Sequence, residues 1–82
     1  MTIEEAAIKE MLITLEKNNI NGFIDSYQEH RDLSPNISHQ EKDITIFLPN
    51  EEHKYFLIED LENDNQLIDI TLDQVIEYLI NN

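Results

Sequence analysis

The chain contains no cysteine, a single glycine, and no Lys or Arg after Lys54. Without cysteine, neither a disulfide framework nor a Cys-based zinc site can form, and nothing marks an oxidising compartment. One glycine is too few for dinucleotide-binding or P-loop motifs, because backbone amides approach a phosphate closely only where several glycines stand together. We therefore expect no nucleotide cofactor, and the cytoplasm is the default location.

The scarcity of basic residues leaves a formal net charge of −13, with 18 acidic against five basic side chains. This charge argues against direct binding to nucleic acid or to an anionic membrane. The N-terminal segment MTIEEAAIKE is acidic where a signal peptide would be basic, and no apolar run reaches membrane-spanning length. The charge suits either a basic protein partner or solubility alone.

The length of 82 residues indicates one domain, 1–82. Hydrophobic residues make up 40% of the chain, and isoleucine alone occurs thirteen times. That content is too high for a disordered chain and can supply a core without disulfides.

The N-terminal segment predicts a helix over about residues 3 to 17. Thr2 and Glu5 have capping-box spacing, and the apolar positions recur at helical intervals. They are Ile8, Met11, Leu12 and Leu15. We expect a second short helix over residues 22–30, with a strand as the alternative, and a surface loop over residues 31–42.

Three strands are predicted next, over residues 43–48, 54–60 and 66–70, and their short connections favour an antiparallel meander. Period-two alternation assigns one set of apolar residues to the covered face of this sheet: Ile44, Ile46, Leu48, Phe56, Ile58, Ile68 and Ile70. A C-terminal helix follows, with Thr71 and Gln74 as a capping box. Its buried stripe is expected to be Leu72, Val75, Ile76 and Leu79. The predicted fold class is thus α+β, with helices packed on one face of the meander.

Catalytic and metal-binding patterns are absent from the sequence. The histidines His30, His39 and His53 lack the i, i+4 pairing that presents two imidazoles to zinc, and no serine has the context of a nucleophile elbow. Asp60, Glu62 and Asp64 have the first three spacings of a calcium loop. The sixth and twelfth positions are nevertheless Asn and Thr, where Gly and Glu are needed. We expect no enzyme, no metal site and no cofactor.

The acidic residues of the last third are the remaining candidate site. Asp73 and Glu77 are one helical turn apart, about 6 Å along the axis, and could approximate the spacing of phosphates in a nucleic acid. Such a surface could occupy the Lys/Arg cleft of a nucleic-acid-binding enzyme. The predicted partner-binding residues are Glu59, Asp60, Glu62, Asp64, Asp69, Asp73 and Glu77.

In size, acidity and Asn/Ile-rich composition the chain resembles small phage-encoded inhibitors of bacterial defence nucleases, the anti-CRISPR proteins among them. It is equally similar in composition to bacterial immunity proteins that neutralise basic toxin nucleases. Both resemblances imply a stoichiometric protein inhibitor. The alternative is a binding or oligomerisation module without mimicry, whose contacts are apolar residues on the second face of the sheet, such as Tyr55, Leu57 and Leu67.

Overall fold

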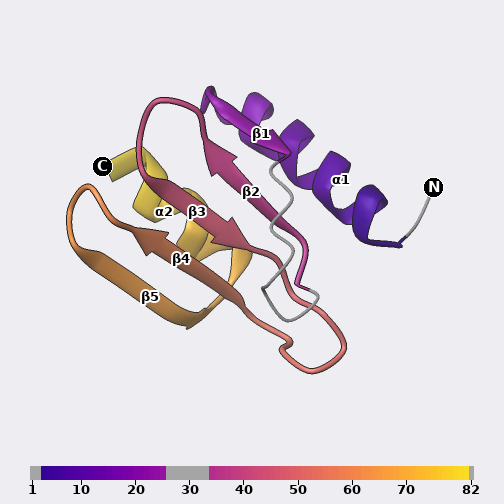
Figure 1. Ribbon diagram of the computed structural model, residues 1–82. Coiled ribbons are helices and arrows are strands. Elements are labelled where there is room, and N and C mark those ends of the chain that lie inside the picture. The colour runs from indigo at the N-terminus through magenta and orange to yellow at the C-terminus, as the bar shows by residue number, and fades with distance from the viewer. Residues whose placement is uncertain (1–2, 26–33, 82) are drawn as a thin grey trace.

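The computed structural model describes residues 3–25 and 34–81, which form two helices and a five-stranded sheet (Figure 1). The elements are α1 (Ile3–Lys17), β1 (Phe23–Asp25), β2 (Asn36–His39), β3 (Ile44–Phe47), β4 (Phe56–Asp60), β5 (Asn65–Ile70) and α2 (Leu72–Asn81). Every neighbouring pair of strands is antiparallel, in the order β1-β2-β3-β4-β5. Neither of the described helices combines the length and apolarity that a membrane span requires.

The predicted three-stranded meander is wrong, because the sheet has five strands. Strands β3 to β5 correspond to the three predicted ones, while β1 and β2 come from segments predicted as a short helix and a loop. These two strands are three and four residues long, too short for a clear alternation in the sequence. Their pairing, Ile24 with Ser38 and Ile37 with Ile46, is a long-range contact that local propensity does not reveal. The remainder of the predicted second helix, 26–30, lies outside the described residues.

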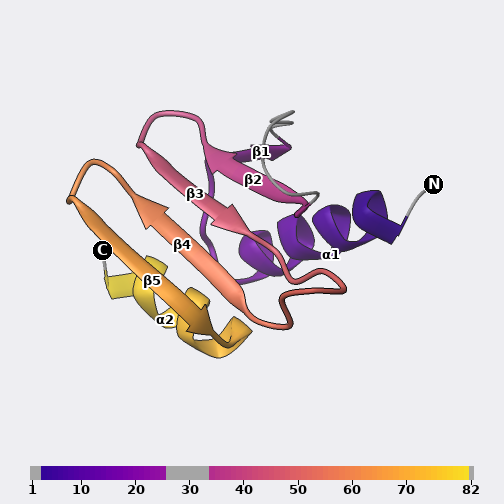
Figure 2. The same ribbon diagram turned by 60° about the horizontal axis from the view of Figure 1, so that its bottom comes forward.

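Both helices cover the same face of the sheet, and within residues 3–25 and 34–81 no helix lies on the other face (Figures 1 and 2). Met11 and Leu15 of α1 and Val75 of α2 pack in one core with the inward side chains of the sheet. The centre of that core is a cross-strand row in which Ile46 of β3 pairs with Ile37 on one side and Ile58 on the other; all three are fully buried. The predicted helices-on-one-face arrangement is confirmed by this core.

Helix α1 ends where Asn19 adopts a left-handed backbone, with φ of 61°. The amide of Asn19 donates to the carbonyl of Glu16 at 3.0 Å, and that of Ile20 donates to Leu15 at 2.9 Å. These two bonds form a Schellman motif, and Ile20 packs against the core that contains Leu15. The Asn-Asn sequence therefore ends the helix and turns the chain toward β1. The predicted capping residue at the other end, Thr2, lies outside the described part.

Helix α2 begins with the predicted capping box. The Thr71 amide donates to Gln74 Oε1 at 2.9 Å, and the Gln74 amide donates to Thr71 Oγ1 at 3.3 Å. The helix buries Val75 and half-buries Ile76 and Leu79, as predicted, but Leu72 is exposed. Leu72 is the first helical residue, and its side chain lines a hollow together with Met11 of α1, Leu48 and Phe56 of β4.

A β-bulge in β5 reverses the predicted face of Ile68, which is 59% exposed. Ile58 pairs with Leu67 and Phe56 with Ile70, so three residue steps on β5 match two on β4. Asp69, within the extra step, has a left-handed φ of 56°. The bulge puts Leu67 and Ile70 against the core and leaves Ile68 outside. Strict alternation from Ile70 assigned Ile68 to the core and Leu67 to the second face, and both assignments are wrong.

Candidate protein-binding surfaces

Asp60, one of the predicted partner-binding acids, is fully buried. Its position follows from alternation in β4, because Asp60 comes two residues after Ile58 and therefore has the same facing. This alternation is visible in the sequence, where Ile58 and Asp60 share one face of the predicted strand 54–60. Asp60 is thus removed from the residues that could contact a partner.

The Asp60 carboxylate joins the β4–β5 turn to α2 through hydrogen bonds. Tyr78 Oη donates to Asp60 Oδ2 at 2.6 Å, and Asn63 donates through its amide at 3.1 Å and through Nδ2 at 2.8 Å. Burial raises the pKa of Asp60, but these hydrogen bonds and the charge of Lys42 outweigh it and hold the pKa below its usual value. Burial, together with the bond to Asp60, raises the pKa of Tyr78. The carboxylate is therefore kept ionised and fixed in place.

Four of the predicted acids lie beside this network and are exposed. Glu62 and Asp64 belong to the β4–β5 turn, and Asp73 and Glu77 lie on the outward side of α2. We refer to Glu62, Asp64, Asp73 and Glu77 as the acidic edge. Because Asp60 binds both Asn63 in the turn and Tyr78 in the helix, the two parts of this edge are held at a fixed separation.

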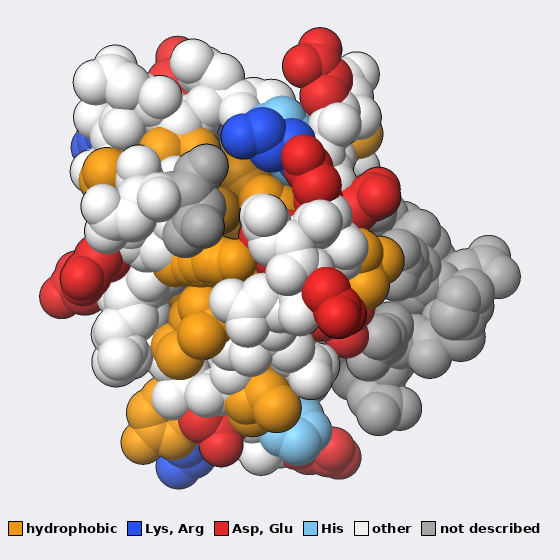
Figure 3. Space-filling model, turned by 90° about the vertical axis from the view of Figure 1, so that its left-hand side faces the viewer, with side chains coloured by type: hydrophobic (Ala, Val, Ile, Leu, Met, Phe, Trp, Pro, Cys, Tyr) orange, Lys and Arg blue, Asp and Glu red, His pale blue; other side chains and the backbone are white. Residues whose placement is uncertain are grey.

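The side of the molecule that carries the β4–β5 turn and the C-terminus is seen in Figure 3. A column of hydrophobic side chains runs through this view, and the acidic side chains stand in separate groups around it. Two large apolar residues of the neighbouring segments are strongly exposed, Leu61 in the turn and Ile80 near the end of α2. An apolar centre with a charged rim is the usual anatomy of a protein–protein interface.

The other two predicted acids lie apart from the acidic edge. Glu59 is half-buried on the open face of the sheet, in register with Thr45 and Gln66. Asp69 lies at the bulge of β5 and lines a hollow described below. The sheet separates Glu59 from the acids of α2, so the seven predicted residues do not form one continuous line.

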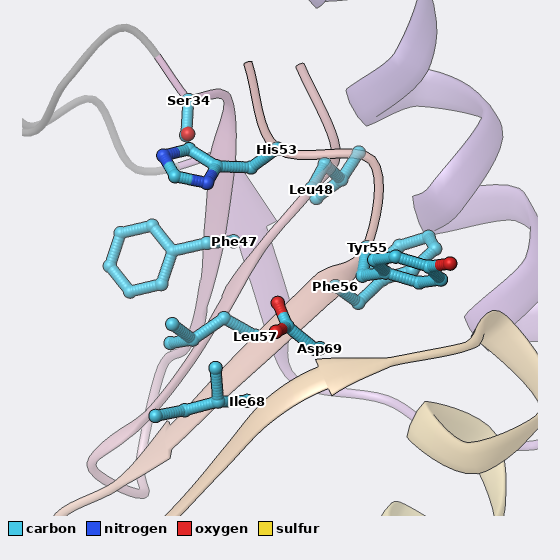
Figure 4. A pocket seen from close by; sticks show the side chains of 9 residues that line it. All are labelled: Ser34, Phe47, Leu48, His53, Tyr55, Phe56, Leu57, Ile68 and Asp69. Atoms are coloured by element: carbon cyan, nitrogen blue, oxygen red, sulfur yellow. The ribbon is translucent and has the colours of Figure 1, made fainter. Parts of the chain in front are cut away.

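A hollow of about 350 Å³ opens at the end of the sheet face opposite the two described helices (Figure 4). Figure 4 shows Ser34 and His53 at one end, Phe47 at one side, and Leu57 and Ile68 at the other end. The Asp69 carboxylate stands between Leu57 and Tyr55. Phe47 is buried although it belongs to the open face and not to the central core, and Tyr55 is 55% exposed. The hollow therefore combines apolar walls with one carboxylate.

The loop between β3 and β4 forms one wall of this hollow and is organised by Asn50. Asn50 Oδ1 accepts from the amides of Glu52 at 2.9 Å and His53 at 2.6 Å, while its Nδ2 donates to Ser34 Oγ at 2.7 Å. An Asn side chain that binds amides two and three residues ahead stabilises a tight turn. This turn places His53 and Tyr55 at the mouth of the hollow. The sequence predicted a turn at this place but not the cavity beside it.

No group of three or more His, Asp or Glu side chains that could hold a metal ion occurs in residues 3–25 and 34–81. Asp60, the first residue of the calcium-like spacing, points into the core and accepts hydrogen bonds from Tyr78 and Asn63. Comparison of the chain with protein-family models, curated proteins and solved structures found no significant match.

Proposed function

We propose that this chain is a stoichiometric protein inhibitor whose acidic edge binds the basic nucleic-acid site of an enzyme. The observation that carries the proposal is the combination of four exposed acids on rigidly connected elements with the lack of any Lys or Arg after Lys54. A surface designed only for solubility usually interleaves both signs of charge. The lack of interleaved bases supports a role for the charge in binding, as in the phage counter-defence proteins and toxin-immunity proteins that the chain resembles in composition.

Electrostatic attraction would make association with such a partner fast and strongly salt-dependent. The exposed apolar residues Leu61 of the turn and Ile80 of α2 would supply the contacts that hold the complex after encounter. Because the acids would act mainly in the encounter and the apolar residues in the final complex, the acids need not form a continuous line. The enzyme would be blocked by occupation of its cleft, so one inhibitor per active site would suffice.

The test is affinity capture from a bacterial lysate at low and high salt, followed by competition. Duplex DNA and single-stranded RNA are added separately to the captured complex, and the released protein is identified. Release of a nucleic-acid-binding enzyme by one of these competitors is the expected result. A captured partner that neither nucleic acid displaces, and whose retention does not change with salt, would contradict the proposal.

A second candidate is a binding module without nucleic-acid mimicry, and the hollow on the open sheet face favours it. Of the three residues predicted for such a surface, Tyr55 and Leu57 line this hollow, whereas Leu67 packs against the core. In that case the partner would be held by the open face, and loss of the acidic edge would leave binding largely intact. The same capture experiment, repeated with variants of the two surfaces, separates the candidates.

A further inference from the structure

The hollow on the open sheet face contains the carboxylate of Asp69. Within residues 3–25 and 34–81, the Asp69 side chain makes no hydrogen bond and no ion pair. Around it stand the apolar walls formed by Phe47, Leu57 and Ile68. A carboxylate beside apolar walls offers a cationic group both a counter-charge and a surface for its hydrocarbon part.

The backbone of Asp69 is also unusual for a strand residue. Its φ of 56° lies in the left-handed region, which costs free energy in any residue with a Cβ, although Asp and Asn bear it better than most. The bulge that contains Asp69 brings its carboxylate to the hollow beside Ile68. Bulges commonly serve to re-aim a side chain at a functional site, and strained residues gather at such sites.

We propose that this hollow binds the side chain of an arginine from a partner protein. The three methylenes of arginine match the apolar walls, and its guanidinium can bind the Asp69 carboxylate with two parallel hydrogen bonds. The planar guanidinium is more weakly hydrated than the lysine ammonium, so it loses less hydration free energy when it enters the hollow. It can also stack on aromatic rings such as Phe47 and Tyr55. The net charge of −13 further favours a cation over an anionic or neutral occupant.

This arginine site goes beyond the acidic edge, because the hollow is on the open face and the helix acids are on the covered side. Arginine is among the residues that most often dominate binding energy at interfaces, where it fills a desolvated pocket. A partner that meets both surfaces would present a basic patch to the acidic edge and one inserted arginine to the hollow. The arginine site would then fix the orientation that the long-range charge does not specify.

The test is a titration of the ¹⁵N-labelled protein, followed by NMR, with three capped tripeptides of the form acetyl-Ala-X-Ala-amide. X is arginine, citrulline or lysine; citrulline keeps the shape of arginine without the charge. We expect the arginine peptide to shift the amides of Tyr55, Leu57, Ile68 and Asp69. We expect it to bind about tenfold more tightly than the citrulline peptide, the effect of one charge-assisted interaction. The lysine peptide should bind more weakly than arginine.

The matched variants are Asp69→Asn and Asp73→Asn, each of which removes one negative charge. Asn tolerates the left-handed backbone of position 69, so the bulge should survive, and the melting temperature and the unperturbed amide spectrum verify this. Asp69→Asn should weaken the arginine peptide about tenfold, and Asp73→Asn should leave its affinity within about twofold. Equal binding of arginine and citrulline would overturn the proposal. So would equal effects of the two variants, because these would indicate unspecific attraction to the acidic surface.

The outcome is independent of the proposed inhibitor function. The titration contains no nucleic acid and no captured enzyme, whereas the competition experiment does not depend on the hollow. A failed titration beside a successful competition would remove the arginine site and leave the acidic edge. The reverse result would leave an arginine-binding module without mimicry.

Discussion

Tyr78 of α2 donates a 2.6 Å hydrogen bond to the fully buried carboxylate of Asp60 in β4. Asn63 holds the same carboxylate from the β4–β5 turn, so a single acid connects the last strand pair to the last helix. Three donors compensate a burial that would otherwise be costly. Because the acidic edge is distributed over that turn and that helix, Asp60 is a positioning residue for the proposed binding surface.

The Asp60 network should make stability sensitive to acid. The pKa of Asp60 is lower in the folded state than in the unfolded state. Its contribution to the free energy of unfolding is therefore fully present above the unfolded-state pKa of about 4, and it is lost as the pH falls through the native pKa. Asp60→Asn should therefore flatten the loss of stability between about pH 4 and pH 2, measured by urea unfolding. Glu62→Gln, an exposed acid in the neighbouring turn, is the control and should keep the wild-type slope. An unchanged slope in Asp60→Asn would show that the carboxylate is not stabilised by folding.

Tyr78 should make the stability of the fold sensitive to alkaline pH. The pKa of Tyr78 is raised in the folded state. Its contribution to the free energy of unfolding is therefore complete below about pH 10 and is lost as the pH rises through the native pKa. Tyr78→Phe should remove that alkaline loss and cost about 1 to 3 kcal/mol at neutral pH, because Asp60 keeps its burial with one donor fewer. Tyr55→Phe is the matched change at an exposed tyrosine and should alter neither quantity. If both variants unfolded like wild type, the Tyr78–Asp60 hydrogen bond would not contribute to stability.

The β5 bulge predicts a large contrast between two isoleucines of adjacent strands. Ile58→Ala should destabilise the fold by about 2 to 5 kcal/mol, because Ile58 is fully buried in the central row. Ile68→Ala should cost less than about 1 kcal/mol, since that side chain lies outside. Chemical denaturation of both variants measures the difference. Similar costs would mean that β5 is paired in the unbulged register with Ile68 inward.

The regular parts of the fold could be predicted from sequence because they repeat a period. Helix α1 and helix α2 follow from apolar spacing and from the Thr71–Gln74 box, and β3 follows from Ile44, Ile46 and Leu48. The errors occur where tertiary pairing decides: the short β1 and β2, and the extra residue at Asp69. Asp60 was predicted among the partner-binding acids, although it alternates with Ile58 in β4. An Asp is accepted at this buried position because Tyr78 of α2 and Asn63 of the turn supply hydrogen-bond donors.

The exposed sites could be predicted only in part. Acid content after Lys54 is a property of composition, so Glu62, Asp64, Asp73 and Glu77 were found without the fold. The hollow brings together the 49–55 loop, β4 and the bulge of β5. No local pattern shows that Phe47, Tyr55 and Asp69 meet, because their proximity depends on register and on the Asn50 turn.

Gly22 should not tolerate a side chain. Its φ of 99° is strained for L residues, and a Cβ there would collide with the imidazole of His39 in β2. Gly22→Ala should destabilise the fold by about 1 to 3 kcal/mol in urea unfolding. Asn21→Ala, at the exposed preceding position, should have a much smaller effect. Equal stability of Gly22→Ala and wild type would contradict the close approach of β1 to β2.

The most direct measurement for the proposed function is the salt dependence of binding after charge reversal on α2. Asp73→Lys with Glu77→Lys should leave the fold intact, because both side chains are exposed, and should slow association with the captured partner. The slope of log Kd against log salt should fall, because fewer charges take part in binding. Glu4→Lys with Glu16→Lys makes the same charge change on α1 and should keep most of the wild-type rate and slope. If the α2 double variant bound its partner as fast as wild type, with the same salt slope, the acidic edge would not be the binding surface.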